Sequence, residues 1–185
     1  MALTESTMLE LGTTAPDFAL TDAISGKAVS RDDFRGQKAL LVMFICAHCP
    51  YVKHIEKAIA TLGNDYAAQP LGIVAISSND AITHPADNPA GLKLQAEKCG
   101  FVFPYLYDEM QAVAHAYKAA CTPDIFLFDD SFRLVYRGQF DQSRPGNGVP
   151  VTGQDLRTAI DQVLAGKPVP TDQRPSVGCN IKWKA

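Results

Sequence analysis

Apolar residues along the chain gather in short runs that predict buried strands. Uninterrupted runs of this kind span Ala39–Ile45, Gly72–Ser77 and Ile125–Phe128. A fourth segment, Arg133–Arg137, alternates apolar and polar residues and follows the turn-like sequence DDS at 129–131. We therefore expect this fourth segment to pair with the preceding strand as a hairpin.

Apolar residues spaced by three and four predict three helices. Their apolar positions are, in chain order, Val52, Ile55, Ile59, Leu62 and Tyr66; Met110, Val113, Ala114 and Tyr117; and Leu156, Ala159, Ile160, Val163 and Leu164. Thr152 and Asp155 predict a capping box at the start of the last helix, and Gly166 suits its end. Residues 79–91 contain two prolines, and we expect a long surface loop there.

The elements follow the order strand, helix, strand, helices, strand, strand, helix. A helix joins the first two strands, so these strands should be parallel with a right-handed crossover, whereas the last two should be antiparallel. The pattern predicts an α/β fold with a four-stranded mixed sheet flanked by helices. We expect a single domain over residues 1–185, with a core at about 12–166, an N-terminal extension and a C-terminal tail at 167–185.

The first predicted strand ends in the sequence CAHCP, which places His48 between Cys46 and Cys49. A helix N-terminus or a nearby cation can lower the pKa of a cysteine from about 8.5 to roughly 3.5–7.5. The motif lies where strand gives way to helix, so unpaired backbone N–H groups should face the sulfurs, and His48 can add a donor or a charge. Two thiols this close can form a disulfide and exchange it with a partner, so the motif favours redox chemistry over packing.

The start of the first helix has two alternatives. Pro50 is tolerated only in a first turn, and it disfavours helical geometry at Cys49. Either Cys46 lies near the N-cap with Pro50 late in the first turn, or Cys49 caps a helix that begins at Pro50. We expect Cys46 to be the attacking thiol and Cys49 to resolve it, because the first cysteine should be the more exposed.

Composition and charge exclude several classes of partner. The chain is 46% hydrophobic and 20% charged, with a net charge of -3 and a pI near 5.7, and it has no basic cluster that would suit a nucleic acid. No apolar stretch is long enough to cross a bilayer, and the N-terminal sequence MALTESTMLELG lacks the features of a secretory signal. We expect a cytoplasmic protein. Its five cysteines, an odd number, fit catalytic or metal-binding thiols better than a structural disulfide framework.

Three segments carry a family resemblance: APDFALTD at 15–22, FRGQKALLVMFICAHCP at 34–50 and CTPDIFLFD at 121–129. They resemble the redoxin branch of the thioredoxin superfamily, which includes the alkyl hydroperoxide reductase and thiol-specific antioxidant proteins. The similarity covers about residues 12–166, and the tail RPSVGCNIKWK at 174–184 resembles that of a peroxiredoxin-like subgroup. The resemblance implies a thioredoxin-like fold and a cis Thr122–Pro123 peptide, in a loop that binds the partner's chain beside the two thiols.

Two comparisons within that superfamily refine the expected chemistry. The sequence CAHC resembles the CPHC centre of a periplasmic oxidant, which implies a centre more oxidising than that of thioredoxin. True peroxiredoxins place a proline seven residues and a threonine three residues before the reactive cysteine, where counting back from Cys49 gives Val42 and Cys46. Counting back from Cys46 gives no match either, and Pro123 stands about where their arginine belongs. Efficient peroxidase activity is therefore not expected.

The other three cysteines differ in what they suggest. Cys99 shares a predicted helix face with Leu92 and Ala96, so we expect it in the core. Cys121 immediately precedes the Thr-Pro loop, where it is either a candidate auxiliary thiol or a packing residue. Cys179 lies in a tail without helix or strand pattern; it is a candidate resolving thiol, although we expect it to face solvent. The remaining histidines are expected to be structural or exposed: His54, His84 and His115.

These patterns predict a thiol–disulfide oxidoreductase that cycles Cys46 and Cys49 between dithiol and disulfide, without a cofactor or a resident metal. Its expected partners are protein or small-molecule thiols and disulfides. One alternative is a thiol peroxidase, in which one cysteine becomes a sulfenic acid and another resolves it. Another is a non-enzymatic redox-sensing or soft-metal-binding protein that holds an ion with two thiolates and a histidine. The oligomeric state, the reductant and the direction of electron flow stay open.

Overall fold

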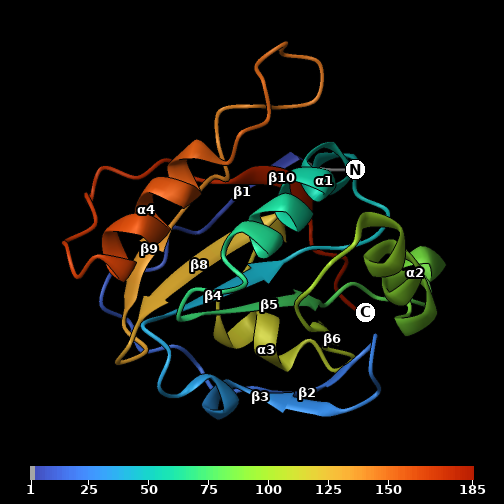
Figure 1. Cartoon of the computed structure of the whole chain (residues 1–185). Coiled ribbons are helices and arrows are strands. Elements are labelled where there is room, and N and C mark those ends of the chain that lie inside the picture. Colours follow the sequence, from blue (N-terminus) through green and yellow to red (C-terminus); the bar gives the residue numbers. More distant parts are fainter. Residues whose placement is uncertain (1–2) are drawn as a thin grey trace.

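A seven-stranded mixed sheet with helices on both faces forms the centre of the protein, as seen in a computed structural model that describes residues 3–185 (Figure 1). The strands of this sheet are β2 (Ala19–Asp22), β3 (Ala28–Ser30), β4 (Ala39–Phe44), β5 (Leu71–Ser77), β6 (Tyr105–Tyr107), β8 (Asp124–Asp129) and β9 (Leu134–Arg137). Their order across the sheet is β3-β2-β6-β5-β4-β8-β9. Strand β4 lies in the interior of the sheet between β5 and β8, so the cysteine motif that follows it lies at the ends of the inner strands.

The helices cover the two faces of the sheet unequally. They are α1 (Pro50–Asp65), α2 (Pro89–Cys99), α3 (Ala112–Ala116) and α4 (Gln154–Leu164), with two short 3-10 turns, η1 (Arg31–Phe34) and η2 (Pro85–Asp87). Figure 1 shows α1 and α4 above the sheet and α3 below it. Leu41 and Met43 of β4 pack into the core beneath α1 and α4, and Val42 and Phe44 pack into the core on the α3 side. Because both faces of β4 are covered, its sequence is apolar throughout rather than alternating.

A second, three-stranded sheet joins the two ends of the chain. Its strands are β1 (Leu3–Glu5), β7 (Cys121–Thr122) and β10 (Val177–Asn180), all antiparallel, in the order β1-β10-β7. In the register of this sheet, Cys179 lies opposite Thr122 on one side and Leu3 on the other. The C-terminal tail is therefore a paired strand, and the expectation that it lacks regular structure is wrong.

The strand pairing expected around the motif is confirmed. Strands β4 and β5 are parallel with α1 between them, and β8 and β9 form an antiparallel hairpin. The expected four-stranded sheet is too small, because β2, β3 and β6 extend it. Those three strands are only three or four residues long, so they carry too few alternations to be recognised in the sequence.

Two of the predicted helices differ from expectation. The helix predicted around Met110 is the five-residue α3, and the Met110 side chain is 79% exposed instead of lying on its apolar face. The capping box of the last helix is absent: Gly153 is the N-cap of α4, with φ of 70°. The N–H groups of Thr152 and Gly153 donate to the Asp141 carboxylate instead. Gly166 follows the end of α4 with φ of 68°, as expected.

Residues 79–91 are not a simple surface loop. They contain η2 and the start of α2, and the side chains of Asn79 and Asp87 are buried. The Asn79 amide donates to the Asp87 carboxylate at 2.8 Å, and the Asn79 oxygen accepts from Lys182 N in the tail. Buried polar groups satisfied in this way hold the segment against the body of the domain.

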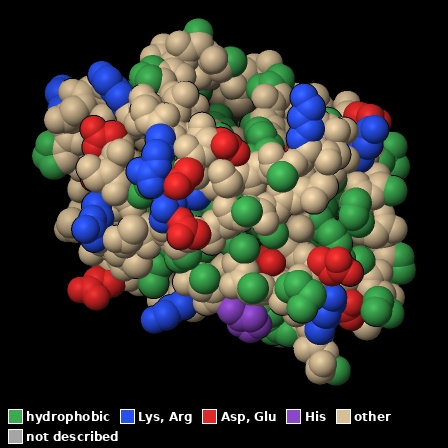
Figure 2. Space-filling view, turned by 90° about the horizontal axis from the view of Figure 1, so that it is seen from below, with side chains coloured by type: hydrophobic (Ala, Val, Ile, Leu, Met, Phe, Trp, Pro, Cys, Tyr) green, Lys and Arg blue, Asp and Glu red, His purple; other side chains and the backbone are tan. Residues whose placement is uncertain are grey.

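Charged groups of both signs are mixed over the surface seen in Figure 2, where Lys and Arg side chains lie among Asp and Glu. Among residues 3–185, none of the helices combines the length and apolar character needed to span a bilayer.

The close contact between β10 and the Thr122–Pro123 peptide predicts that a methyl group added at Gly178 lowers the stability of the fold. A Cβ added at Gly178 would stand 2.0 Å from the Thr122 carbonyl oxygen. Because the clash is with backbone, we expect Gly178→Ala to lower the free energy of unfolding in urea by about 1–3 kcal/mol. Gly148→Ala is the control, because a Cβ there meets nothing within 4 Å and only the positive φ adds strain. Equal losses in the two variants would contradict the prediction.

Candidate active site

The cysteine motif occupies the turn between β4 and α1. Cys49 is the N-cap residue of α1, with φ of -67° and ψ of 125°, and its carbonyl accepts from Lys53 N at 2.9 Å. Pro50 takes the first helical position, where its missing N–H costs nothing. The second of the two expected alternatives is therefore correct: Cys49, not Cys46, caps the helix that begins at Pro50.

Both cysteines of the motif are buried. The exposed fraction of each residue is 0%, so the expectation that Cys46 is the more exposed is wrong. Cys46 Sγ lies 3.4 Å from Thr122 Oγ1 and 3.7 Å from His48 Nδ1. Its carbonyl accepts from the Gln95 side chain of α2 at 3.3 Å, so α2 helps to hold this turn in place.

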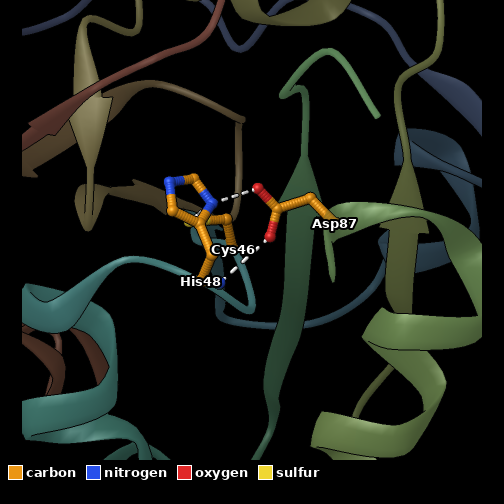
Figure 3. Close-up of side chains that lie close together, drawn as sticks. All are labelled: Cys46, His48 and Asp87. Atoms are coloured by element: carbon orange, nitrogen blue, oxygen red, sulfur yellow. Dashed lines mark hydrogen bonds and ion pairs between the residues drawn. The ribbon is translucent and has the colours of Figure 1, made fainter. Parts of the chain in front are cut away.

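Asp87 fixes the backbone of the motif from 40 residues further along the chain. Its Oδ1 accepts from the N–H groups of Ala47 and His48 at 2.8 and 3.1 Å, and its Oδ2 accepts from the His48 ring (Figure 3). Burial opposes ionisation of Asp87, but the bonds from His48, Asn79 and Ala47 outweigh it and lower the pKa of this carboxyl. Sequence reasoning missed Asp87, because its distance from the motif leaves no local pattern to detect.

The ring of His48 is bound to this carboxylate rather than to a sulfur. Its Nδ1 lies 2.5 Å from Asp87 Oδ2, much closer than the 3.7 Å to Cys46 Sγ. The ring of His84 packs on it with centroids 4.7 Å apart, so His84 is part of the site although it was expected to be structural or exposed. The Asp87 carboxylate lies closer to the His48 ring than the Cys46 sulfur does, so this structure gives no separate support for His48 stabilising a thiolate. The expectation of a centre more oxidising than that of thioredoxin therefore rests on the resemblance alone.

The negative charge of the pair resides on Cys49. A hydrogen bond from the Cys46 thiol is the largest influence, and together with bonds from the Cys179 thiol and Val52 N–H it outweighs burial and lowers the pKa of Cys49 to about 4. Burial raises the pKa of Cys46, and its bond to Cys49 and the charge of Asp87 raise it further. These opposite directions favour the thiolate on Cys49 and the proton on Cys46, whereas we expected Cys46 to be the attacking thiol.

The Thr122–Pro123 peptide is cis, as the resemblance implied, and lies beside both thiols. The carbonyl oxygen of Thr122 is 3.3 Å from Cys49 Sγ, and its hydroxyl is close to Cys46 Sγ. The predicted partner-binding residues are thus brought to the cysteine pair. In this structure β10 pairs with the strand that contains Thr122.

The remaining cysteines lie at different distances from the pair. Cys179 is only 3% exposed and its Sγ lies 2.6 Å from Cys49 Sγ, so the expectation that it faces solvent is wrong. Cys121 is buried against the Pro123 carbonyl, with its Sγ 3.5 Å from that oxygen, and burial raises its pKa. Cys99 ends α2 and is only partly buried, so it packs against the core instead of lying within it as expected.

A buried acid, Asp124, follows the cis peptide at the start of β8. Its Oδ2 accepts from Ala120 N at 3.0 Å, while its Oδ1 has no partner among the described residues. Burial raises the pKa of Asp124 to about 7, against the bonds from neighbouring backbone N–H groups. An acidic residue directly before the apolar run Ile125–Phe128 is the sequence signal that could have pointed to this group.

Cys46, His48 and Asp87 could each offer one ligand atom to a metal, because these atoms lie within 4.8 Å of one another. The two oxygens of Asp87 already accept hydrogen bonds from Ala47, His48 and Asn79. An ion would have to displace the bond from the His48 ring, and three ligands are fewer than a structural zinc site uses. The donor set therefore fits an ion poorly.

Comparisons with known proteins agree with this fold and identify the family. A model of the AhpC/TSA family matches residues 11–137. The crystal structure of an uncharacterized conserved protein from Geobacillus kaustophilus is 53% identical, covers 100% of this chain and 97% of its own, and has a TM-score of 0.97. Thiol-disulfide oxidoreductase ResA of Geobacillus thermodenitrificans (strain NG80-2) is 30% identical over 131 residues, which are 71% of this chain and 70% of that protein.

A more distant structure confirms the expected fold. The thioredoxin domain of a thiol-disulfide oxidoreductase from Bacteroides vulgatus is 20% identical and covers 81% of this chain and 97% of its own, with a TM-score of 0.62. The thioredoxin-like fold and the resemblance to the redoxin branch are thus both confirmed.

The bonds of Asp87 predict a large loss of stability when the carboxylate is removed. Asp87→Ala leaves the partly buried N–H groups of Ala47 and His48 and the buried Asn79 amide without this acceptor, so we expect the free energy of unfolding to fall by about 2–4 kcal/mol. Asp87→Asn should lose less, because its amide oxygen can keep those two bonds. Urea denaturation measures both, with the exposed Asp172→Ala as control. A loss in Asp87→Ala no larger than in the control would refute this role.

Asp124 predicts a pH dependence of stability. Its pKa is about 7 in the fold against an ordinary 3.8, so between these values only the folded state keeps the proton, and stability falls as pH rises. A shift of this size corresponds to roughly 4 kcal/mol between pH 4 and pH 8. Asp124→Asn cannot titrate, so its free energy of unfolding should fall less over that range than that of the wild type or of the surface control Asp130→Asn. Parallel pH profiles would contradict the assignment.

Proposed function

The chain belongs to the AhpC/TSA family, and from that premise we propose that it catalyses thiol–disulfide exchange by cycling Cys46 and Cys49 between dithiol and disulfide. The observation that carries the proposal is the thiolate of Cys49 at the N-terminus of α1, with the proton of the pair on Cys46. The cis Thr122–Pro123 peptide beside both sulfurs supports it. The relative from Geobacillus thermodenitrificans, which bears the name of a thiol-disulfide oxidoreductase, points the same way.

The charge distribution assigns the two steps of the exchange. The Cys49 thiolate attacks one sulfur of the partner disulfide, and the other partner sulfur leaves as a thiolate and takes up a proton. Cys46 then gives up its proton and attacks Cys49 Sγ in the mixed disulfide, which releases the second partner thiol. The partner disulfide gains two electrons and the pair becomes a disulfide; the same steps in reverse oxidise a partner dithiol.

Cys49 is the nucleophile in this scheme because it carries the charge. The reactive species in exchange is the thiolate, and burial combined with the charge of Asp87 keeps Cys46 protonated until Cys49 has reacted. His48 and Asp87 act as positioning residues: the carboxylate holds the backbone of the turn and the ring covers Cys46.

A partner can reach the pair only when part of its cover moves. Cys49 is covered by Cys179 of β10, and β10 pairs with β7 through only two residue pairs, Cys179 with Thr122 and Asn180 with Cys121. This two-pair ladder is shorter than the six-pair ladders of β4, so within the sheets it is the pairing that opening over Cys49 must break. We propose that β10 moves away from Cys49 when a protein or small-molecule disulfide binds. We also propose that the reaction takes place in the cytoplasm.

Peroxide reduction is the second candidate, because a cysteine whose pKa is about 4 is also a suitable nucleophile for peroxide. The groups that most strongly favour this thiolate are two thiols, the Val52 N–H and the Thr122 hydroxyl, and none of them is a guanidinium. This environment suits sulfur-to-sulfur exchange better than the polarisation of a peroxide.

The reduction of insulin by dithiothreitol tests the proposed activity. We expect the wild-type protein to accelerate the reaction and Cys49→Ser to fall to the rate of dithiothreitol alone, because the variant lacks the attacking thiolate. Cys99→Ser, which changes a cysteine at the far end of α2, should keep the wild-type rate. If Cys49→Ser accelerates the reaction as well as the wild type does, the proposal is wrong. Rapid stoichiometric consumption of hydrogen peroxide, with dimedone attached to Cys49, would favour the peroxidase instead.

A further inference from the structure

Cys49 contacts a sulfur outside its own motif. Cys179 Sγ lies 2.6 Å from Cys49 Sγ, and the two residues are 130 positions apart in the chain. A disulfide bond is about 2.05 Å long, so these sulfurs need to approach by only about half an ångström to be bonded. The site thus contains three neighbouring sulfurs, with Cys49 hydrogen-bonded to both of the others.

The backbone holds Cys179 in this position. Its strand, β10, is paired on both sides, with Leu3 and Thr122 opposite Cys179. Ser176, just before β10, donates from its hydroxyl to the Pro123 carbonyl at 2.5 Å. The Cα of Gly178 approaches the Thr122 carbonyl so closely that a side chain could not fit there. Cys179 is therefore placed at Cys49 by a sheet, and not by the chance position of a loose tail.

We propose that Cys179 is a third redox-active thiol of this centre, able to form a disulfide with Cys49 in place of Cys46. The inference rests on the proposed exchange activity and adds a second resolving residue to it. The oxidised centre can then exist in two forms, a Cys46–Cys49 disulfide and a Cys49–Cys179 disulfide.

Two routes lead to the second disulfide. In one, the Cys179 thiolate attacks Cys49 Sγ of a mixed disulfide and the partner sulfur leaves as a thiol, as it does when Cys46 resolves. In the other, the Cys179 thiolate attacks Cys49 Sγ of the Cys46–Cys49 disulfide, and Cys46 leaves as a thiolate that takes up the proton lost by Cys179. The first route completes the two-electron reduction of the partner, and the second is an isomerisation without net oxidation.

The charge on Cys49 controls when Cys179 can react. In the reduced centre, burial together with the bond to the Cys49 thiolate and its charge raises the pKa of Cys179 to about 12, so the thiol stays protonated. Once Cys49 has become part of a disulfide it carries no charge, and two of these three influences disappear. Lys182 adds a positive charge that favours the thiolate. Cys179 is therefore held as a thiol until Cys49 has been oxidised.

The second disulfide would change what the tail can do. The Cys49–Cys179 disulfide would join β10 covalently to the N-cap residue of α1, and Cys46 would become a thiol again. The cover that must move for a partner to enter is thereby fixed in place after oxidation, and reduction releases it.

Peptide mapping distinguishes the two disulfides directly. The full-length protein is reduced, oxidised with glutathione disulfide, alkylated with iodoacetamide and digested with trypsin. Cleavage leaves Cys46 and Cys49 together in peptide 39–53 and Cys179 in peptide 158–182, because Lys167 and Arg174 precede prolines. A Cys46–Cys49 disulfide closes one peptide on itself, whereas a Cys49–Cys179 disulfide links two peptides.

Four variants make the test specific. We expect linked peptides from the wild type and from Cys46→Ser, and equally from Cys46→Ser/Cys121→Ser, which removes the other buried thiol near the site. Cys179→Ser should give only the closed peptide 39–53. In Cys46→Ser/Cys179→Ser nothing can resolve an attack by Cys49, so the mixed disulfide of Cys49 with glutathione should accumulate roughly tenfold or more above its level in Cys46→Ser.

The outcomes separate this inference from the proposed function. If Cys179 is fully alkylated in the oxidised wild type and in Cys46→Ser while peptide 39–53 of the wild type is closed, the inference is overturned and the exchange activity stands. If neither disulfide forms in the wild type, which carries no substitution that could disturb folding, both fail. Linked peptides that persist in Cys46→Ser/Cys121→Ser establish Cys179 as the third thiol.

Discussion

A negative charge on the buried sulfur of Cys49 is the constraint on which the site depends. A buried thiolate persists only if hydrogen-bond donors replace the water that it has lost. Here the donors are the thiols of Cys46 and Cys179, the Val52 N–H in the first turn of α1 and the Thr122 hydroxyl. The position of Cys49 as the N-cap of α1 brings its sulfur close to the Val52 N–H, while burial, the bond to Cys49 and the charge of Asp87 raise the pKa of Cys46.

The surroundings of that charge come from three distant parts of the chain. Asp87 of η2 holds the backbone of the turn, Thr122 contacts both sulfurs, and β10 adds Cys179 as a cover. The same contacts that stabilise the thiolate also keep a partner out, which makes the paired tail strand the natural point of control. Chemistry at Cys49 and the position of β10 are therefore coupled, because one sulfur contact belongs to both.

The fold could be predicted from the sequence where the pattern was long and unambiguous. The apolar run of β4, the amphipathic α1 and the hairpin of β8 and β9 are recognisable because each element buries a continuous face. The short strands β2, β3 and β6 were missed because three or four residues do not establish a period. The segment around Asp87 looked like a loop because its buried groups are polar and are satisfied by tertiary hydrogen bonds.

The sequence by itself determined that two thiols stand at a strand–helix junction, because spacing and periodicity act within a few residues. The resemblance to the redoxin branch added the cis peptide at Pro123. Only the tertiary structure decided which sulfur is charged, how deeply both are buried, and that Asp87 and Cys179 belong to the site. Those contacts join residues 40, 73 and 130 positions apart, and such residues meet only once the whole sheet has formed.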